Sequence, residues 1–479
     1  MNKSMVRYLL SKLLLIEAAL LLVPLLVAII YSESLRVLNS IGITIGILLI
    51  LGLLGSAFKP KNYHIYTKEG LLIVALCWIF WSFFGALPFV LSGQIPNIID
   101  AFFEMSSGFT TTGATILPDV SVLSHSLLFW RSFAHLIGGM GVLVFALAIM
   151  ENSKNSHLEV MRAEVPGPVF GKVVSKLKET AQILYIIYLT MFVILAVIFK
   201  IVGLPIYDSI IIAMGCAGTG GFSIYNDSIA HYNSSLITNI ISISVLLFGI
   251  NFNLYYFLLL RKFKAFFKDE ELRTYIGIII IATVLIWLNV GGLYTSASKG
   301  LEIALFEVTN VMTTAGFGIT DLTIWPLFSQ VILFILMFIG GSTGSTAGGI
   351  KVMRALILTK ISKNQILSTL YPNRIMTLHI NHQPLDKETQ HGVLKYFSLY
   401  ITLFVGLILI LSLDNNNFLV VASAAASTFN NIGPILGTSE TFAIFSPFSK
   451  LVMSFAMIAG RLEVYPMLLL FIPKTWSKY

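Results

Sequence analysis

Charged residues are scarce in this chain. Only 11% of its 479 residues are charged, whereas 56% are hydrophobic, and a soluble domain carries roughly 25% charge. This shortage argues against a chain folded in water and predicts a protein that lies in a lipid bilayer. Cysteine is scarce too. Cys77 and Cys216 both fall in apolar surroundings, which is typical of free, packed thiols, so no disulfide framework is predicted.

Long apolar runs stand where a soluble protein would alternate polar and apolar residues. A membrane span needs roughly 20 apolar residues. Ten predicted spans lie near 8–31, 37–58, 70–92, 126–151, 178–202, 234–261, 273–293, 324–358, 391–413 and 445–472. The first run contains Glu17 and Pro24 and lacks a small-residue cleavage site, so it is expected to remain as an anchor.

The basic residues orient these spans. Twenty-five of the 31 Lys and Arg residues lie at the N-terminus and in 59–68, 151–181, 261–273, 351–395 and 474–478. The positive-inside rule makes this face cytoplasmic, with both termini inside. The net charge of +8 is therefore a topological signal, and no nucleic acid is expected as a partner. The opposite loops are acidic and should attract cations at an outer mouth; they carry Asp100, Asp119, Asp208, Asp227, Asp321, Asp414 and Glu440.

Four short polar segments, each ending in glycine, recur between the apolar runs. They read FTTTG at 109–113, CAGTG at 216–220, MTTAG at 312–316 and FNNIG at 429–433, and their glycines lie 107, 96 and 117 residues apart. This period is too long for a soluble solenoid and fits a membrane module of helix, re-entrant segment and helix used four times.

A short apolar stretch precedes each segment, at 95–107, 205–216, 301–313 and 416–428. Runs of roughly 10–14 apolar residues are candidate re-entrant helices, and irregular backbone at membrane depth survives only inside protein or beside water. Glycine lets consecutive carbonyls point the same way, and a ring of carbonyl oxygens can replace the hydration shell of a cation. One segment alone would fit a helix-packing motif better than a pore, but four at matching places favour a pore.

These segments resemble the filter sequences of the Trk/Ktr/HKT potassium-transporter superfamily. The resemblance rests on SGFTTTGAT at 107–115, TTAGFG at 313–318, FNNIGP at 429–434, RSFAHLIGGMG at 131–141 and GRLE at 460–463. The extra hairpin at 8–58 points to the TrkH-type branch. The resemblance implies an all-α polytopic membrane protein with four pore repeats in pseudo-fourfold arrangement plus an N-terminal two-helix hairpin. It also implies a cation channel-like protein that moves K⁺ inward, holds no organic cofactor and is not an enzyme.

The same resemblance implies a selectivity filter. Gly113 matches the potassium-type residue, where serine marks sodium-type pores, and the second segment departs most from the pattern. The metal-binding set implied for K⁺ is Thr111, Thr112, Gly113, Gly218, Thr219, Gly220, Thr314, Ala315, Gly316, Asn431, Ile432 and Gly433.

A glycine-rich run is predicted to interrupt the second span of the third repeat, and of no other repeat. Glycine costs roughly 1 kcal/mol relative to alanine in a helix, and P-loop spacing is absent, so a phosphate cradle is disfavoured. The resemblance implies a gate below the filter; a passive kink is the alternative. The run comprises Gly340, Gly341, Ser342, Thr343, Gly344, Ser345, Thr346, Ala347, Gly348 and Gly349.

Four further polar residues lie within or beside the predicted spans. Arg461 should face the aqueous cavity, because burying it is expensive; the resemblance places it under the filter as a barrier and a support of the gate, with a structural pair to Glu463 as the alternative. Glu104 and Glu307 each precede a filter glycine by nine residues and are expected to buttress the filter. His135 is interpreted as a packed polar residue, since no Cys or His lies at ligand spacing.

The predicted division is a hairpin at 1–64 and pore repeats at 65–175, 176–268, 269–385 and 386–479. Neither 151–181 nor 351–395 is long enough for a nucleotide-binding domain, so the resemblance implies a separate cytosolic ring of the TrkA type that binds NAD or ATP. It further implies a homodimer in the inner (plasma) membrane. The alternative function is an H⁺- or Na⁺-coupled carrier that uses Glu104, Glu307 or Asp208. A membrane enzyme would need a nucleophile–base pair or a metal cluster, and the spans show neither.

Overall fold

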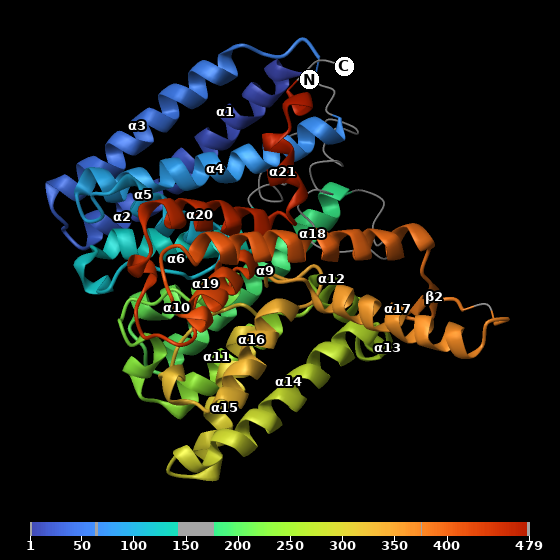
Figure 1. Cartoon of the computed structure of the whole chain (residues 1–479). Coiled ribbons are helices and arrows are strands. Elements are labelled where there is room, and N and C mark those ends of the chain that lie inside the picture. Colours follow the sequence, from blue (N-terminus) through green and yellow to red (C-terminus); the bar gives the residue numbers. More distant parts are fainter. Residues whose placement is uncertain (1, 63–65, 142–176, 375, 477–479) are drawn as a thin grey trace.

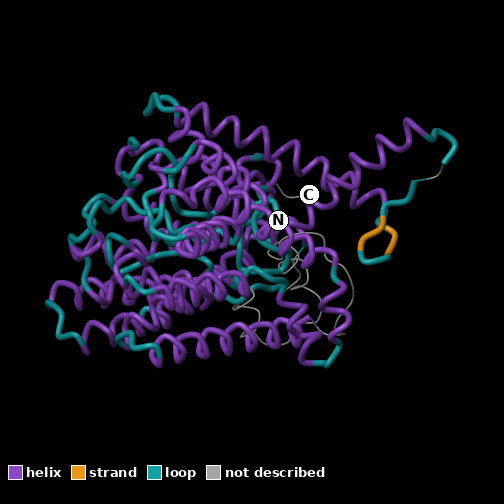
Figure 2. Tube along the Cα trace, turned by 90° about the horizontal axis from the view of Figure 1, so that it is seen from below, coloured by secondary structure: helices purple, strands orange, loops and turns teal. Residues whose placement is uncertain are grey.

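The computed structural model describes residues 2–62, 66–141, 177–374 and 376–476. This part of the chain is almost entirely helical (Figure 1). Its strands are β1 (His379–Ile380) and β2 (Gln383–Pro384), which pair antiparallel. Figure 2 shows this small hairpin projecting from the helical body. The span predicted at 126–151 and the basic segment 151–181 lie partly outside the described residues.

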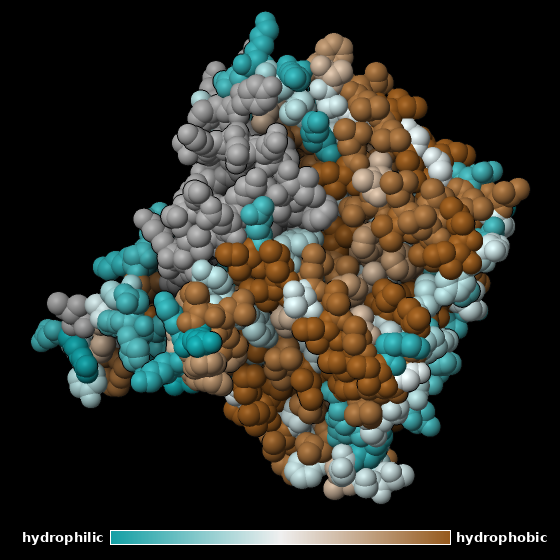
Figure 3. Space-filling model, turned by 180° about the vertical axis from the view of Figure 1, so that it is seen from behind, coloured by the Kyte–Doolittle hydropathy of each residue, from teal (hydrophilic) through white to brown (hydrophobic). Residues whose placement is uncertain are grey.

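The N-terminal hairpin is as predicted. Helices α1 (Lys3–Leu20) and α2 (Leu22–Ile30) form one apolar segment of 28 residues, and α3 (Leu35–Ala57) runs back beside it. Asn2 begins α1, because its side chain accepts a hydrogen bond from the Met5 N–H. Figure 3 shows a broad hydrophobic surface on one face of the molecule, as a lipid-facing protein requires.

One long helix opens each repeat. These helices are α4 (Thr67–Ser92), α9 (Leu177–Ile201), α14 (Glu270–Val290) and α18 (Lys387–Leu411). With the two members of the hairpin they make six helices in the described residues that are long and apolar enough to cross a membrane, or up to seven if one bent pair is a single span.

A shorter helix follows in each repeat, where a re-entrant helix is predicted. These pore helices are α5 (Ile98–Phe109), α10 (Ile206–Gly218), α15 (Ala297–Met312) and α19 (Phe418–Asn430). At 1.5 Å per residue, each falls short of the roughly 30 Å hydrocarbon core. A 3₁₀ turn comes after each filter segment: η1 (Val120–Val122), η2 (Ser228–Tyr232), η4 (Leu322–Ile324) and η5 (Phe442–Ile444).

The second long helix of every repeat is broken or ends early, so the prediction that only the third repeat is interrupted is wrong. The helices are α6 (His125–Gly139), α11 (Ser235–Phe248) with α12 (Phe252–Leu259), α16 (Leu327–Ile339) with α17 (Val352–Leu370), and α20 (Pro447–Arg461) with α21 (Tyr465–Phe471). The axes of α11 and α12 differ by 89°. In the first, third and fourth repeats a positive φ accompanies the end of the helix, at Gly141, Gly340, and Glu463 with Val464. The bend between α11 and α12 has none, with φ −75° at Gly249 and −59° at Asn251. The third break carries the longest glycine-rich run, the first carries a shorter one at Gly138-Gly139-Met140-Gly141, and the second and fourth carry none.

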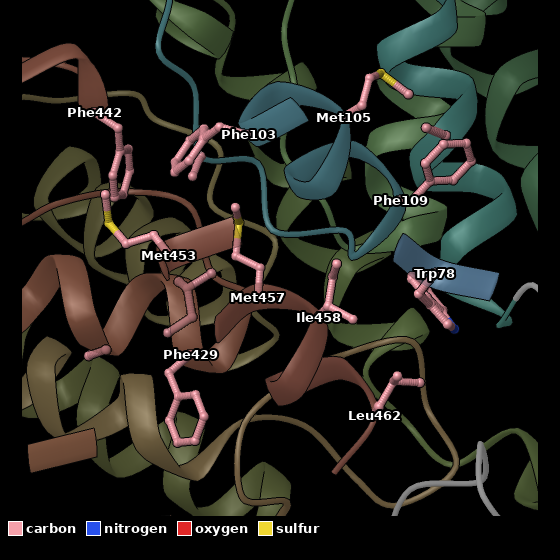
Figure 4. Packing of buried hydrophobic residues seen from close by; sticks show 14 of the residues in the cluster. Trp78, Phe103, Met105, Phe109, Phe429, Phe442, Met453, Met457, Ile458 and Leu462 are labelled. Atoms are coloured by element: carbon pink, nitrogen blue, oxygen red, sulfur yellow. The ribbon is translucent and has the colours of Figure 1, made fainter. Parts of the chain in front are cut away.

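The first and fourth repeats meet across a tightly packed apolar core (Figure 4). Phe103 of α5 lies near Met453 of α20, whereas Met105 points to the other side of α5, toward Gly85 of α4. The rings of Phe103 and Phe442 have centroids 5.3 Å apart. The chain is thus an all-α polytopic membrane protein of four similar repeats and an N-terminal hairpin. The remaining short elements are α13 (Phe263–Lys268), η3 (Gly291–Leu293) and η6 (Pro473–Thr475).

Candidate functional site

The same backbone turn follows all four pore helices. Each has a non-glycine residue with φ between 49° and 59° and, two residues later, a glycine with φ between 71° and 110°. The pairs are Thr111 with Gly113, Thr219 with Gly221, Thr314 with Gly316, and Asn431 with Gly433. The turn therefore repeats at one register through all four segments.

This register corrects the sequence prediction for the second segment. Gly221, rather than Gly220, is the structural equivalent of Gly113. Helix α10 continues through Gly218, so the three equivalent residues are Thr219, Gly220 and Gly221 instead of Gly218, Thr219 and Gly220. Two consecutive glycines made the register ambiguous in the sequence.

The four glycines and the residues before them form a closed ring. A β-carbon on Gly113 would overlap the carbonyl oxygen of Gly220, and one on Gly433 would lie 2.8 Å from the carbonyl oxygen of Thr112. The two remaining contacts of the ring have the same form: Gly221 lies against the carbonyl of Ala315, and Gly316 lies against that of Ile432. Each repeat thus touches the next in chain order, and the fourth touches the first. Glycine is required at all four positions both by the positive φ and by the close backbone approach.

Buried polar side chains of three pore helices hold the chain beyond the filter glycine. In each case a side-chain oxygen accepts a hydrogen bond from the main-chain N–H three residues after that glycine. The pairs are Glu104 with Ile116 at 3.1 Å, Glu307 with Ile319, and Ser423 with Leu436 at 2.9 Å. This geometry fits the buttress role expected for Glu104 and Glu307.

Glu104 has a charged partner that sequence reasoning missed. The Arg131 Nη2 lies 2.6 Å from Glu104 Oε1, and both side chains are almost fully buried. The guanidinium also stacks over the ring of Phe222, 3.9 Å from its centroid. A charged residue within an apolar run was the available signal. His135 lies nearby as a packed residue, with Nδ1 2.7 Å from the Gly108 carbonyl oxygen and its ring stacked on Phe222.

Asn431 links the last filter segment to the first. Its Nδ2 donates to the Thr112 hydroxyl and to the Met457 carbonyl, both at 2.9 Å. The side chain is fully buried. Because Thr112 contributes one carbonyl of the ring, Asn431 positions the junction at which the ring closes.

The glycine-rich loop, residues 340–349, contacts three of the four filter segments. The Gly348 N–H donates to the Thr314 hydroxyl at 2.7 Å, and the Thr219 hydroxyl donates to that of Thr346 at 3.3 Å. A β-carbon on Gly348 would overlap the carbonyl oxygen of Asn430. Most of the loop is buried. It therefore lies where a movement would reach the ends of the pore helices.

Two elements outside the loop hold it in place. The Ser342 N–H donates to Gly249 O, and the Phe252 N–H donates to Gly344 O, each at 3.0 Å, which ties the loop to the break between α11 and α12. Glu271, near the start of α14, accepts from the N–H groups of Thr343 at 2.6 Å and Met353 at 3.1 Å. Glu271 is almost fully buried. Nothing in the sequence pattern identified its role.

Arg461 binds both the loop and the end of α6. Its guanidinium donates to the carbonyls of Thr346 at 2.7 Å, Gly138 at 2.6 Å and Gly139 at 2.7 Å. The carboxylate of Glu463, the alternative partner predicted for Arg461, forms an ion pair with Arg354 at 2.6 Å.

Carboxylates on the predicted outer side make local contacts. Asp100 forms an ion pair with Lys450 at 2.8 Å. Asp119 accepts from the Asn226 amide at 2.9 Å, and this bond, with those from Ser121, lowers the pKa of Asp119 below its ordinary value. Asp119 therefore stays ionised at neutral pH and can contribute to a negative field on this side.

Four short helices whose following turns meet in one ring, set among helices long enough to cross a membrane, are an arrangement typical of membrane transport proteins. A family model described as TrkH, a cation transport protein, matches residues 40–478, and the chain belongs to this family. It is a transporter rather than an enzyme.

Named relatives agree over nearly the whole chain. The Trk system potassium uptake protein TrkH of Salmonella typhimurium is 36% identical over 430 residues, covering 88% of each chain. TrkG of Escherichia coli is 32% identical and covers 95% of this chain and 94% of its own. The crystal structure of the potassium transporter TrkH from Vibrio parahaemolyticus superposes with a TM-score of 0.89 at 31% identity, over 100% of both chains.

Proposed function

We propose that this protein takes up potassium ions across the inner membrane through a single-chain pore. The observation that carries the proposal is the closed ring in which each filter glycine abuts a carbonyl of the next repeat. Inward-facing carbonyl oxygens can replace the hydration shell of K⁺ without any side-chain charge. The relatives named as potassium uptake proteins support K⁺ as the transported ion.

The coordinating groups are the filter carbonyls, with the register of the second segment corrected. The set is Thr111, Thr112, Gly113, Thr219, Gly220, Gly221, Thr314, Ala315, Gly316, Asn431, Ile432 and Gly433. The carboxyl ends of the pore helices point toward these turns, and their dipoles favour a cation there.

Residues 340–349 act as the gate, and Arg461 acts as its latch and as an electrostatic barrier. The support for this role is that the loop bonds to Thr219 and Thr314, while Arg461 bonds to Thr346. A fixed positive charge below a cation filter raises the energy of an ion at that depth. Moving the loop away breaks these contacts and opens the path.

The remaining features follow the same assignment. Both termini are cytoplasmic, as the basic loops indicate, and the pore repeats occupy 65–175, 176–268, 269–385 and 386–479 after a hairpin at 1–64. A cytosolic TrkA-type ring that binds NAD or ATP acts on the gate, and the chain assembles as a homodimer. The name shared by the relatives, a Trk system, supports an assembly with further components.

Ion flux in liposomes tests the proposal. The purified chain should carry K⁺ down its gradient, with a reversal potential set by K⁺ and independent of pH. A reversal potential that moves with pH would instead favour a coupled carrier. The contacts argue against that alternative at two of its candidate sites, because Glu104 is paired with Arg131 and Asp208 accepts hydrogen bonds from Tyr225 and Tyr232.

A further inference from the structure

The connection between the second and third repeats has an unusual surface. Residues 259–268, here called the interfacial segment, comprise the end of α12, a short turn and α13. The segment exposes large apolar side chains, with Leu259 67%, Leu260 47%, Phe263 56% and Phe267 67% accessible. Four basic side chains are interleaved and exposed as well: Arg261, Lys262, Lys264 and Lys268.

Helical spacing sorts these side chains. Phe263 and Phe267 are one turn apart and share one side of α13, whereas Lys264 and Lys268 share a neighbouring side. Phe266, the third aromatic residue, turns inward toward Tyr255, with ring centroids 6.4 Å apart. The outward side thus combines aromatic rings with ammonium groups, the combination found at the boundary between acyl chains and lipid headgroups.

The basic charges are not neutralised by the acidic residues that follow. Asp269 caps α14 and accepts from the Asn381 side chain at 2.8 Å. Glu270 is paired with Lys360, and Glu271 holds the glycine-rich loop. Within the described residues, none of the four basic side chains of the interfacial segment forms an ion pair. Four uncompensated positive charges over ten residues call for a negatively charged partner.

We propose that the interfacial segment is a docking surface for anionic phospholipid headgroups, and that lipid bound there restrains the glycine-rich loop. A lipid surface fits better than a protein because the exposed rings stand beside basic groups and the segment leads directly into α14, where Ile280 and Ile281 are exposed and apolar. α14 is a candidate membrane span, so the segment at its N-terminal end lies at the membrane boundary. Figure 1 places α13 beside the start of α14.

The link to the loop comes from connectivity. α13 joins the two elements that hold residues 340–349: the break between α11 and α12, bonded through Gly249 and Phe252, and the start of α14, bonded through Glu271. Two residues separate Lys268 from Glu271. Fixing α13 on a charged surface therefore fixes both supports of the loop. Releasing α13 loosens both, and flux without a regulatory partner rises.

Lipid binding is tested first, without any transport measurement. The intact protein is titrated with phosphatidylglycerol in detergent, and the lipid retained is measured by native mass spectrometry. Each basic residue near an anionic surface contributes roughly fivefold in binding, so Lys262→Gln, Lys264→Gln and Lys268→Gln together should weaken retention on the order of a hundredfold. The matched control is the triple change Lys363→Gln, Arg374→Gln and Lys387→Gln, at exposed basic positions around the small hairpin that projects from the helical body. It should retain lipid as the parent does.

Ion flux tests whether bound lipid restrains the glycine-rich loop. This part of the inference, unlike lipid binding itself, rests on the proposed gate. In liposomes of phosphatidylcholine, adding phosphatidylglycerol should lower the basal K⁺ flux of the parent and of the control, and leave the α13 variant unaffected. Replacing the same three lysines with arginine should restore both retention and the lipid response. That rescue separates a charge effect from misfolding.

Three results would overturn the inference. Equal lipid retention by the parent and the glutamine variant would remove the docking surface. Lost retention with an unchanged lipid response of flux would remove the coupling while leaving lipid docking and the pore assignment intact. If the variant kept its lipid but lost its response to a cytosolic regulatory protein, the surface would belong to that protein.

Discussion

A β-carbon on Gly221 would overlap the carbonyl oxygen of Ala315. This close contact defines the register of the second filter segment, because each of the other filter glycines also lies against a carbonyl oxygen of the next repeat. It also means that the ring tolerates no side chain at these positions. In the pore proposed above, backbone carbonyls are the groups available to an ion at this level.

The first prediction concerns this register. Gly221→Ala should abolish K⁺ flux, since alanine adds a clash with the Ala315 carbonyl to a φ of +74°. Gly318→Ala is the matched control, because a β-carbon there meets nothing within 4 Å, and it should conduct normally. The measurement is K⁺ flux in liposomes, compared between the two variants and the parent at equal protein density. Normal flux through Gly221→Ala would refute the ring.

Substitutions at the first and fourth filter glycines should have graded effects. Gly113→Asp and Gly433→Asp should each abolish flux while leaving membrane insertion intact, because charge and bulk enter the ring. The milder Gly113→Ser should admit Na⁺ more readily, measured as the shift of reversal potential under K⁺ and Na⁺ gradients. Unchanged relative permeability would remove Gly113 from the determinants of selectivity.

Shortening the glycine-rich loop should raise flux. Deleting Ser342 to Thr346 removes the contacts to Gly249 and Thr219 and the carbonyl that Arg461 binds. We expect greater partner-independent flux in liposomes than for the parent. A folded, inserted deletion that conducts no more than the parent would show that this loop is not the gate.

Two substitutions of Arg461 distinguish the effect of its charge from the effect of its hydrogen-bonding geometry. Arg461→Ala should increase flux, because it removes both the barrier charge and the three carbonyl contacts. Arg461→Lys keeps the charge but loses the planar fork, so its flux should stay closer to that of the parent. Liposome flux and protein yield are compared for all three. Reduced yield for both variants with no gain of flux would assign Arg461 a purely structural role.

The two buttress glutamates should differ in stability. Glu104→Gln leaves Arg131 buried without its counter-ion, which costs roughly 3–5 kcal/mol. Glu307→Gln keeps an oxygen that can accept from Ile319, so about 1 kcal/mol is expected. Thermal unfolding in detergent measures both, with Glu307→Gln serving as the matched control. Equal shifts would show that the Arg131 pair adds nothing.

The sequence by itself determined the membrane class, the hairpin, the four re-entrant helices and three of the four filter glycines. These features are local: apolar run length defines a span, and glycine marks positions where no β-carbon fits. The family resemblance added the transported ion as an expectation. Each of these signals is contained within a few tens of residues.

Only the tertiary structure decided the rest. The Gly-Gly pair at 220 and 221 could be registered only against Ala315 of the next repeat. The roles of Arg131, Glu271 and Arg461 depend on partners far away in the chain, such as Thr346, which lies 115 residues from Arg461. The breaks in the second helices of the second and fourth repeats carry no glycine-rich run, because packing against neighbouring repeats, rather than local propensity, stabilises their backbone torsions.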